Sequence, residues 1–303
     1  MAELETAHAS LPNDSRLFEV RGYIERRRPG GTDEMALRYF ERAIELDPRN
    51  TFVLRQAAFS YDDLRRYAEE EIVLDRALAI EPDNNRWKVA RARVDYDSKA
   101  DTRRYHQVIE EIRTKDPNDI KNSANNWLVC ALAERDPAAV ASALAVLGEN
   151  GFGGETLIYS QRFVEGLIAR MTHQDTMGRA AFTAARSEQD KLVRDHPDDT
   201  GALCVLGLID AALGRKEEAL GEGRRAVELL PVEKDVANGK RMIMSLARIA
   251  AWVGDKDLAC QQLAVVIQLP SELSYGELKL QPWWDPLRGD PCFEKLVSSL
   301  APK

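Results

Sequence analysis

The residues best suited to catalysis or metal binding are four histidines and four cysteines, scattered along the 303-residue chain. They are His8, His106, His173, His196, Cys130, Cys204, Cys260 and Cys292. No two cysteines have zinc-type or redox-type spacing, and no histidine has a convincing second ligand at the spacing of a helical metal site. We therefore predict no metal and no cofactor. Isolated cysteines in apolar contexts are typical of reduced thiols in the cytoplasm.

Two short segments resemble reactive sites. His196 stands among Asp195, Asp198 and Asp199, but it precedes Pro197 in a turn that ends a helix, where polar residues are expected. The glycine-rich segment 148–154 lacks the lysine and the serine or threonine of a phosphate-binding loop, and it follows a helical pattern rather than a strand. We interpret the first as a helix-ending turn and the second as a flexible joint.

Charged residues do not indicate an enzyme or a nucleic-acid site. Acidic runs such as Asp62–Asp63 lie on arginine-rich helices, where solvated ion pairs are expected. Arg26–Arg28 is a short basic run at a helix end. The formal net charge of −8 argues against nonspecific binding to nucleic acid. The apolar stretch 202–213 is interrupted by Asp210 and is too short to span a bilayer, so we predict no membrane contact.

A pattern of small residues followed by a proline recurs along the chain. Small residues and a proline recur at Gly207, Ala219, Ala226 and Pro231, with steps of 12, 7 and 5 residues. The same steps relate Ala58, Glu70, Ala77 and Pro82, and similar steps relate Gly22, Ala36, Ala43 and Pro48, and Ala247, Ala259, Val266 and Pro270. Two antiparallel helices cross closely where both carry small side chains, and the proline ends the second helix. The spacing therefore predicts stacked helix hairpins with essentially no β-sheet.

This pattern resembles the tetratricopeptide repeat family. The match is strong at 51–84 and 199–231 and good at 17–50 and 240–270. It is degraded at 85–118, where Arg104 and Glu111 stand at positions of small residues, and residues 119–147 and 157–197 read as helix pairs with a poor repeat signature. Asp175–Thr176 is interpreted as the N-cap of a long helix that runs to about Arg194. The resemblance implies an all-α superhelix, an α-solenoid of stacked antiparallel hairpins with a C-terminal capping segment.

We divide the chain into an N-terminal sub-array (1–147), a glycine-rich joint (148–156), a C-terminal sub-array (157–270) and a cap (271–303). Asp290–Pro291 predicts the start of the last helix, and Trp283 and Trp284 are expected to anchor the cap. Leu4, Ala7 and Pro12 fit the tail of a second helix, which suggests a chain cut from a longer polypeptide. The tail resembles one that closes the repeat region of certain bacterial regulators with a kinase, cyclase or winged-helix domain.

In the tetratricopeptide family the first helices of successive hairpins line a concave face that binds partners. The resemblance therefore implies a partner-binding surface formed by Tyr23, Phe52, Arg55, Phe59, Asp62, Arg86, Arg93 and Tyr96. Alternatively, Phe59 and Tyr96 pack between helices. Some members of the family bind the C-termini of chaperones through a lysine and an asparagine on one first helix and basic residues on the next two. This chain does not match that pattern, because Arg55, Phe59 and Ala90 stand at the corresponding positions. In the C-terminal sub-array the inward residues are more apolar, and they either hold a helix or are covered by the chain's own cap. These are Cys204, Leu208, Ala211, Met244, Arg248 and Trp252.

The sequence thus favours a non-catalytic scaffold that binds a protein or peptide segment, as the interaction or sensory region of a bacterial cytoplasmic regulator. One alternative is a structural module that forms a homo-oligomer through exposed helix faces. Another is an enzyme with a site at the joint, which the lack of a nucleophile, base or metal set disfavours.

Overall fold

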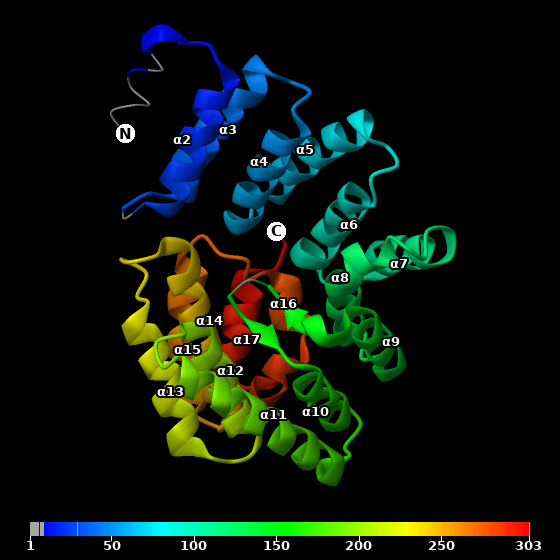
Figure 1. Cartoon of the computed structure of the whole chain (residues 1–303), viewed down its shortest axis with the longest axis vertical. Coiled ribbons are helices and arrows are strands. Elements are labelled where there is room, and N and C mark those ends of the chain that lie inside the picture. The colour runs from blue at the N-terminus through cyan, green and yellow to red at the C-terminus, as the bar shows by residue number, and fades with distance from the viewer. Residues whose placement is uncertain (1–5, 7–8, 29, 155, 303) are drawn as a thin grey trace.

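The computed structural model describes residues 6, 9–28, 30–154 and 156–302, and these residues form a solenoid of antiparallel helix hairpins (Figure 1). The first four hairpins are α2 (Ser15–Arg27) with α3 (Asp33–Leu46), α4 (Thr51–Asp63) with α5 (Tyr67–Ile80), α6 (Asn85–Lys99) with α7 (Arg103–Lys115), and α8 (Ile120–Ala133) with α9 (Pro137–Leu147). Three more follow: α10 (Gln161–Met171) with α11 (Asp175–Asp195), α12 (Thr200–Ala212) with α13 (Lys216–Leu229), and α14 (Val236–Trp252) with α15 (Lys256–Gln268). The all-α solenoid expected from the sequence is confirmed.

The small residues of the repeat lie where helices cross. Ala77, Ala219 and Ala226 are fully buried. A Cβ atom added to Gly22 would lie 2.4 Å from the ring of Phe40, and one added to Gly207 would lie 2.8 Å from Ile249 Cδ1. Side chains at these positions would push the paired helices apart, because a packed interior has no room for extra atoms.

Polar residues fix the starts of the helices by accepting backbone hydrogen bonds. Asn50 accepts from Val53 N at α4, Asp199 from Ala202 N at α12, and Asp290 from Cys292 N at the last helix. The N-cap expectation for α11 is wrong, because Asp175 lies within its first turn and Gln174 occupies the cap without a side-chain bond. Asp175 can still act there through its charge, which favours a helix N-terminus.

The glycine-rich segment forms a compact turn and hairpin rather than an open linker. It contains the 3-10 turn η1 (Gly148–Asn150), and strand β1 (Phe152–Gly153) pairs antiparallel with β2 (Ile158–Tyr159). Gly148, Gly151 and Gly153 have positive φ angles, which explains why glycine stands there. Phe152 and Tyr159 stack with ring centroids 5.8 Å apart, so the hairpin joins the aromatic core.

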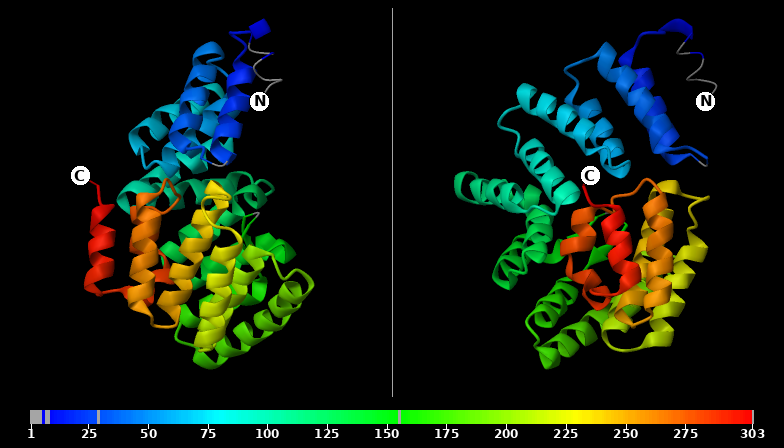
Figure 2. Two further views of the ribbon diagram at one scale, coloured as in Figure 1. Left: turned by 90° about the vertical axis from the view of Figure 1, so that its left-hand side faces the viewer. Right: turned by 180° about the vertical axis from the view of Figure 1, so that it is seen from behind.

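The solenoid curves until its two ends meet. Helix α14 contacts α2, and the segment after α15 returns to the inner face of the first hairpins (Figure 2). We call residues 271–281 the closing segment; it includes the short helix α16 (Tyr275–Leu280), which packs against α6 and α8. Ser271 N donates to Asp63 O (2.8 Å), and Gln281 Nε2 donates to Tyr96 Oη (2.9 Å).

The chain after the closing segment completes the core. It comprises the 3-10 helix η2 (Pro282–Leu287) and helix α17 (Pro291–Ser299), which packs against α15 and α16. Trp283 and Trp284 are almost fully buried. Trp283 stacks on Tyr159 (5.5 Å) and Trp252 (6.1 Å), so this tail ties the central hairpin β1–β2 to α14.

Two further sequence expectations concern the N-terminus and membranes. Leu4 and Ala7, which suggested the tail of a preceding helix, lie outside the described residues, whereas Pro12 is exposed in a turn before α2. Across the described part of the chain, every helix is too short or too polar to cross a bilayer.

The register can be tested at a helix crossing. Ala77→Trp should lower the free energy of unfolding by about 1–3 kcal/mol or more, because Ala77 has no exposed surface and its neighbours cannot make room. Ala68→Trp, at an exposed position of the same helix, should change it little. Chemical denaturation of both variants measures the difference, and equal midpoints would place Ala77 outside the crossing.

The closure can be tested with two glycines. A Cβ atom on Gly276 would lie 1.9 Å from the carbonyl oxygen of Tyr96, a backbone atom that cannot move aside, whereas nothing lies within 4 Å of one on Gly221. Gly276→Ala should therefore destabilise the protein by about 1–3 kcal/mol. Gly221→Ala, in an exposed turn of α13, should be neutral or stabilising by up to about 1 kcal/mol. A Gly276→Ala variant as stable as the parent would contradict this docking of α16.

Candidate functional site

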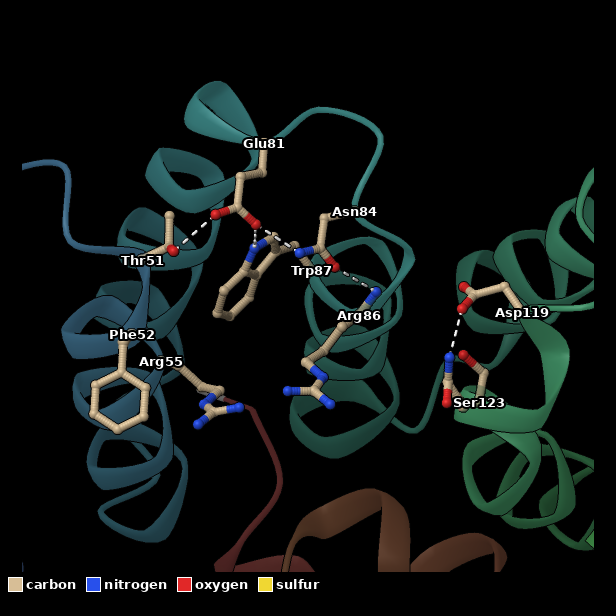
Figure 3. Close-up of a pocket in the computed structure, with 10 residues that line it drawn as sticks. Thr51, Phe52, Arg55, Glu81, Asn84, Arg86, Trp87, Asp119 and Ser123 are labelled. Carbon is tan, nitrogen blue, oxygen red and sulfur yellow. Dashed lines mark hydrogen bonds between the residues drawn. The ribbon is translucent and has the colours of Figure 1, made fainter.

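A cavity of about 430 Å³ lies at the N-terminal ends of three successive first helices, α4, α6 and α8 (Figure 3). We call it the first-helix groove. It is lined by Thr51, Phe52, Arg55, Glu81, Asn84, Arg86, Trp87, Asp119, Asn122 and Ser123. Three of the residues expected on the binding surface, Phe52, Arg55 and Arg86, therefore meet in one cavity.

The acidic residues of the groove are held by neutral donors. Glu81 accepts from Thr51 Oγ1 (2.8 Å), Asn84 Nδ2 (2.6 Å) and Trp87 Nε1 (2.8 Å), and these hydrogen bonds lower its pKa. Asp119 accepts from the side-chain amides of Asn85 and Asn122, which lower its pKa in the same way. Both carboxylates therefore stay charged while their lone pairs point at the protein, and they fix the shape of the groove.

The two arginines have no such partners. Neither Arg55 nor Arg86 has a carboxylate of the described residues within ion-pairing distance, although Asp119 lies across the cavity. The Arg55 guanidinium lies 5.1 Å from the centre of the Phe52 ring, and its buried Nε has no hydrogen-bond partner among the described residues. Figure 3 shows both guanidinium groups extending into the space between α4 and α6. They leave several N–H donors directed at whatever enters the groove.

The remaining positive character comes from the backbone. Helices α4 and α6 begin at Thr51 and Asn85, so their N-terminal ends face the same cavity as the arginines. Helix N-termini carry partial positive charge and favour anions. The groove can therefore bind a carboxylate through arginine and accommodate an apolar group against Phe52.

Other expected surface residues lie outside the cavity lining. Tyr23 packs beside it, with its ring 6.0 Å from Phe52 and 5.8 Å from Phe40. Phe59 lies two helical turns beyond Phe52 and keeps 55% of its surface exposed, so it does not pack between helices. Both extend the aromatic character of this face along α2 and α4.

Tyr96 does not join this open surface, and Asp62 and Arg93 lie outside the cavity lining, which corrects the expectation that one face contains all eight residues. Tyr96 is only 1% exposed and is held by Gln281 of the closing segment. Arg93 donates to Asp97 (3.0 Å), and Asp97 in turn accepts from Ser274 (2.8 Å). Sequence reasoning missed this because the chain's own C-terminal segment occupies the inner face at that level.

The apolar lining of the C-terminal sub-array is also covered from within. Trp252 Nε1 donates to the carbonyl oxygen of Trp283 (2.9 Å), and the Arg248 guanidinium lies 5.3 Å from the Trp283 ring centre. At Arg248 and Trp252 of this lining, the structure therefore shows the alternative in which the chain's own cap covers it.

A group of buried carboxyls accompanies the closure. Glu70 stands at a helix-crossing position, is 8% exposed and has an unpartnered Oε2. Burial, followed by the nearby charges of Asp62 and Asp97, raises its pKa to about 10. Burial also raises the pKa of Asp62 and of Asp97. The charge of Arg93 acts in the opposite direction on all three pKa values, but burial is the larger effect.

No protein-family model and no curated protein matches the chain. The tetratricopeptide resemblance therefore stays a prediction, which depends on the spacing of small residues.

The pKa of Glu70 predicts how stability depends on pH. A carboxyl whose pKa is raised in the folded state stabilises it at low pH, and this contribution is lost as pH rises towards about 10. As the pH rises from about 6 to about 9, the free energy of unfolding of the parent should therefore fall relative to that of Glu70→Gln. We expect the difference between the two proteins to change by more than about 1 kcal/mol in favour of the variant, since each pKa unit is worth about 1.4 kcal/mol.

The matched control is Glu69→Gln. The pKa of Glu69 is lowered by the hydrogen bond from Arg66, so its carboxylate is charged throughout that pH range. Denaturant unfolding at several pH values measures all three proteins, and parallel curves for Glu70→Gln and the parent would contradict the assignment.

Proposed function

We propose that this protein is a non-catalytic scaffold that binds a segment of another protein in the first-helix groove. The observation that carries the proposal is the meeting of Arg55 and Arg86, from successive first helices, in one cavity where neither has an ion-pair partner among the described residues. A cavity of this size admits a few side chains of a peptide, and adjoining aromatic residues can extend the contact.

Charge selects the chemistry of the partner. Arg55, Arg86 and two helix N-termini favour a carboxylate on their side of the groove, whereas Glu81 and Asp119, which keep their negative charge, disfavour one next to them. An arginine pair is suited to bidentate contacts with carboxylates. The partner segment therefore carries Asp or Glu at the groove.

Exposed aromatic rings add a second element of recognition. Phe52 and Phe59 are 41% and 55% exposed on the same helix, and Tyr23 borders Phe52. Aromatic and arginine side chains dominate many protein interfaces. We propose that the partner's acidic residue is followed by an apolar or aromatic one that packs on these rings.

The wider context belongs to the same proposal. We propose that the hairpins are tetratricopeptide repeats and that the chain is the interaction region of a bacterial cytoplasmic regulator. Supporting this are the repeat spacing, the closing tail and four cysteines without disulfides. A homo-oligomer would instead bury the face of α10 and α11 that exposes Met177, and measuring the mass in solution separates the two.

The groove is tested by reversing its charge. Arg55→Glu with Arg86→Glu should weaken partner binding about 30-fold or more, because losing such contacts costs about 2 kcal/mol or more. The partner is first captured from a lysate of the source cells with the parent protein, and its affinity is then measured for each variant.

Arg93 is unsuitable for this test because it is paired with Asp97, which also accepts a hydrogen bond from Ser274 of the closing segment. The control is Arg38→Glu with Arg49→Glu, which makes the same change in net charge at exposed positions outside the groove. All variants are checked by circular dichroism. Equal affinity of the groove variant and the control would remove the first-helix groove as the binding site.

A further inference from the structure

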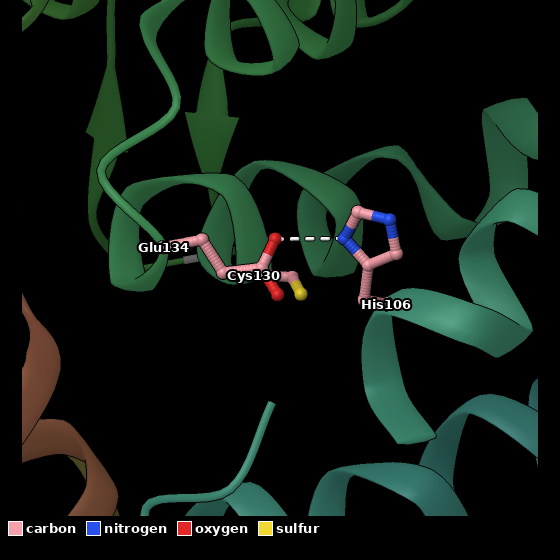
Figure 4. Close-up of side chains that lie close together, drawn as sticks. All are labelled: His106, Cys130 and Glu134. Atoms are coloured by element: carbon pink, nitrogen blue, oxygen red, sulfur yellow. Dashed lines mark hydrogen bonds and ion pairs between the residues drawn. The ribbon is translucent and has the colours of Figure 1, made fainter. Parts of the chain in front are cut away.

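Three side chains of types that bind metals converge between α7 and the C-terminal end of α8, the helix whose N-terminal end lines the first-helix groove (Figure 4). They are His106 of α7, Cys130 of α8 and Glu134, the C-cap residue of α8. One donor atom from each lies within 4.8 Å of the other two, and His106 Nδ1 is 2.8 Å from Glu134 Oε2. The spacing of these residues in the sequence does not reveal the group, because His106 is on another helix from Cys130.

The donor set suits zinc. Cysteine sulfur, imidazole nitrogen and carboxylate oxygen are its three common protein ligands, and a tetrahedral site separates ligand atoms by roughly 3.5 Å. Glu134 stands four residues after Cys130, and its backbone continues the right-handed helical conformation past the end of α8, which puts the two side chains on the same face. His106 and Glu134 keep 53% and 24% of their side-chain surface exposed, so small rotations can bring the three atoms to that spacing.

A cavity of about 210 Å³ opens at the three donors. Two other acidic residues line it, but each has another role: Glu110 is paired with Arg113, and Asp136 caps α9 through the backbone N–H groups of Ala138 and Ala139. The cavity therefore leaves a fourth position next to the three ligands, with room for a water molecule.

We infer that His106, Cys130 and Glu134 form a zinc-binding site that links α7 to α8, with water as the fourth ligand. A thiolate, a carboxylate and a neutral imidazole balance the charge of Zn²⁺. Binding releases the Cys130 thiol proton to solvent, so affinity rises with pH. The link joins a hairpin whose repeat pattern is degraded to the next one, and it stabilises that junction by mass action.

Cobalt provides a direct test, because a Co²⁺–thiolate bond gives a charge-transfer absorption in the near ultraviolet. The metal-free full chain is titrated with Co²⁺ and then with Zn²⁺. We expect one Co²⁺ per chain, visible bands of tetrahedral intensity, and complete displacement by Zn²⁺. Absence of the charge-transfer band in the parent would overturn the proposal.

Variants identify the ligands. Cys130→Ser should abolish the charge-transfer band, whereas Cys292→Ser should leave it unchanged. Cys292 is exposed and neighbours Cys260, so this control detects cobalt bound by that other thiol pair. His106→Ala should weaken Co²⁺ binding at least about tenfold.

His106 is half exposed, so its variant remains informative even if Cys130→Ser does not fold. A band that persists in Cys130→Ser, a band lost in Cys292→Ser, or an unchanged affinity in His106→Ala would each overturn the proposed ligand set.

Discussion

The closure of the solenoid on itself is the contact on which the rest of the structure depends. Each helix hairpin leaves one face uncovered, and the hairpins at the ends of an array have no neighbour to bury it. Here the last hairpin and the closing segment supply that neighbour to the first hairpins. Lys240 of α14 is nearly buried between Asp63 (2.7 Å) and Asp33 (3.9 Å), which belong to the opposite end of the array. Burying these charges is tolerable only because they are paired.

The closing segment covers only one part of the inner face that the first helices form, and the other part remains open. Towards the C-terminal ends of α4 and α6, Asp63 and Tyr96 bond to the closing segment. Towards their N-terminal ends, Arg55 and Arg86 line the groove. The closing segment thus fixes the C-terminal ends of α4 and α6, whereas their N-terminal ends line the open groove. A surface fixed in this way loses little conformational entropy on binding, which favours affinity.

The spacing of residues within each repeat was enough to predict the helix hairpins. It could not predict contacts between residues that lie far apart in the sequence. The steps from Gly207 to Pro231 sufficed for the hairpins, because small residues at crossings and a terminating proline act within one repeat. Phe52, Arg55 and Arg86 followed from the same register. The burial of Tyr96 did not, because Gln281, its partner, is 185 residues away. The meeting of His106 with Glu134, 28 residues along the chain, depends likewise on how successive hairpins stack.

One local signal of the closure was nevertheless present in the turns. Six hairpins have a three-residue turn, and in five of them the middle residue has a positive φ angle; two of these residues are glycines, Gly214 and Gly254, and one is His173. The other two are Arg65 and Arg135, with φ angles of 55° and 59°. A side chain in this conformation costs about 1 kcal/mol or more relative to glycine.

Both arginines offset that strain through contacts with the C-terminal tail. Arg65 Nε donates to the carbonyl oxygen of Leu273 (2.9 Å) and its Nη2 to Ser271 Oγ (2.9 Å). Arg135 forms a two-point pair with Asp285 (2.6 Å for each N–O contact). At Arg65 and Arg135 the side chain therefore offsets the strain of its turn by bonding to another segment of the chain, a contact that glycine could not make.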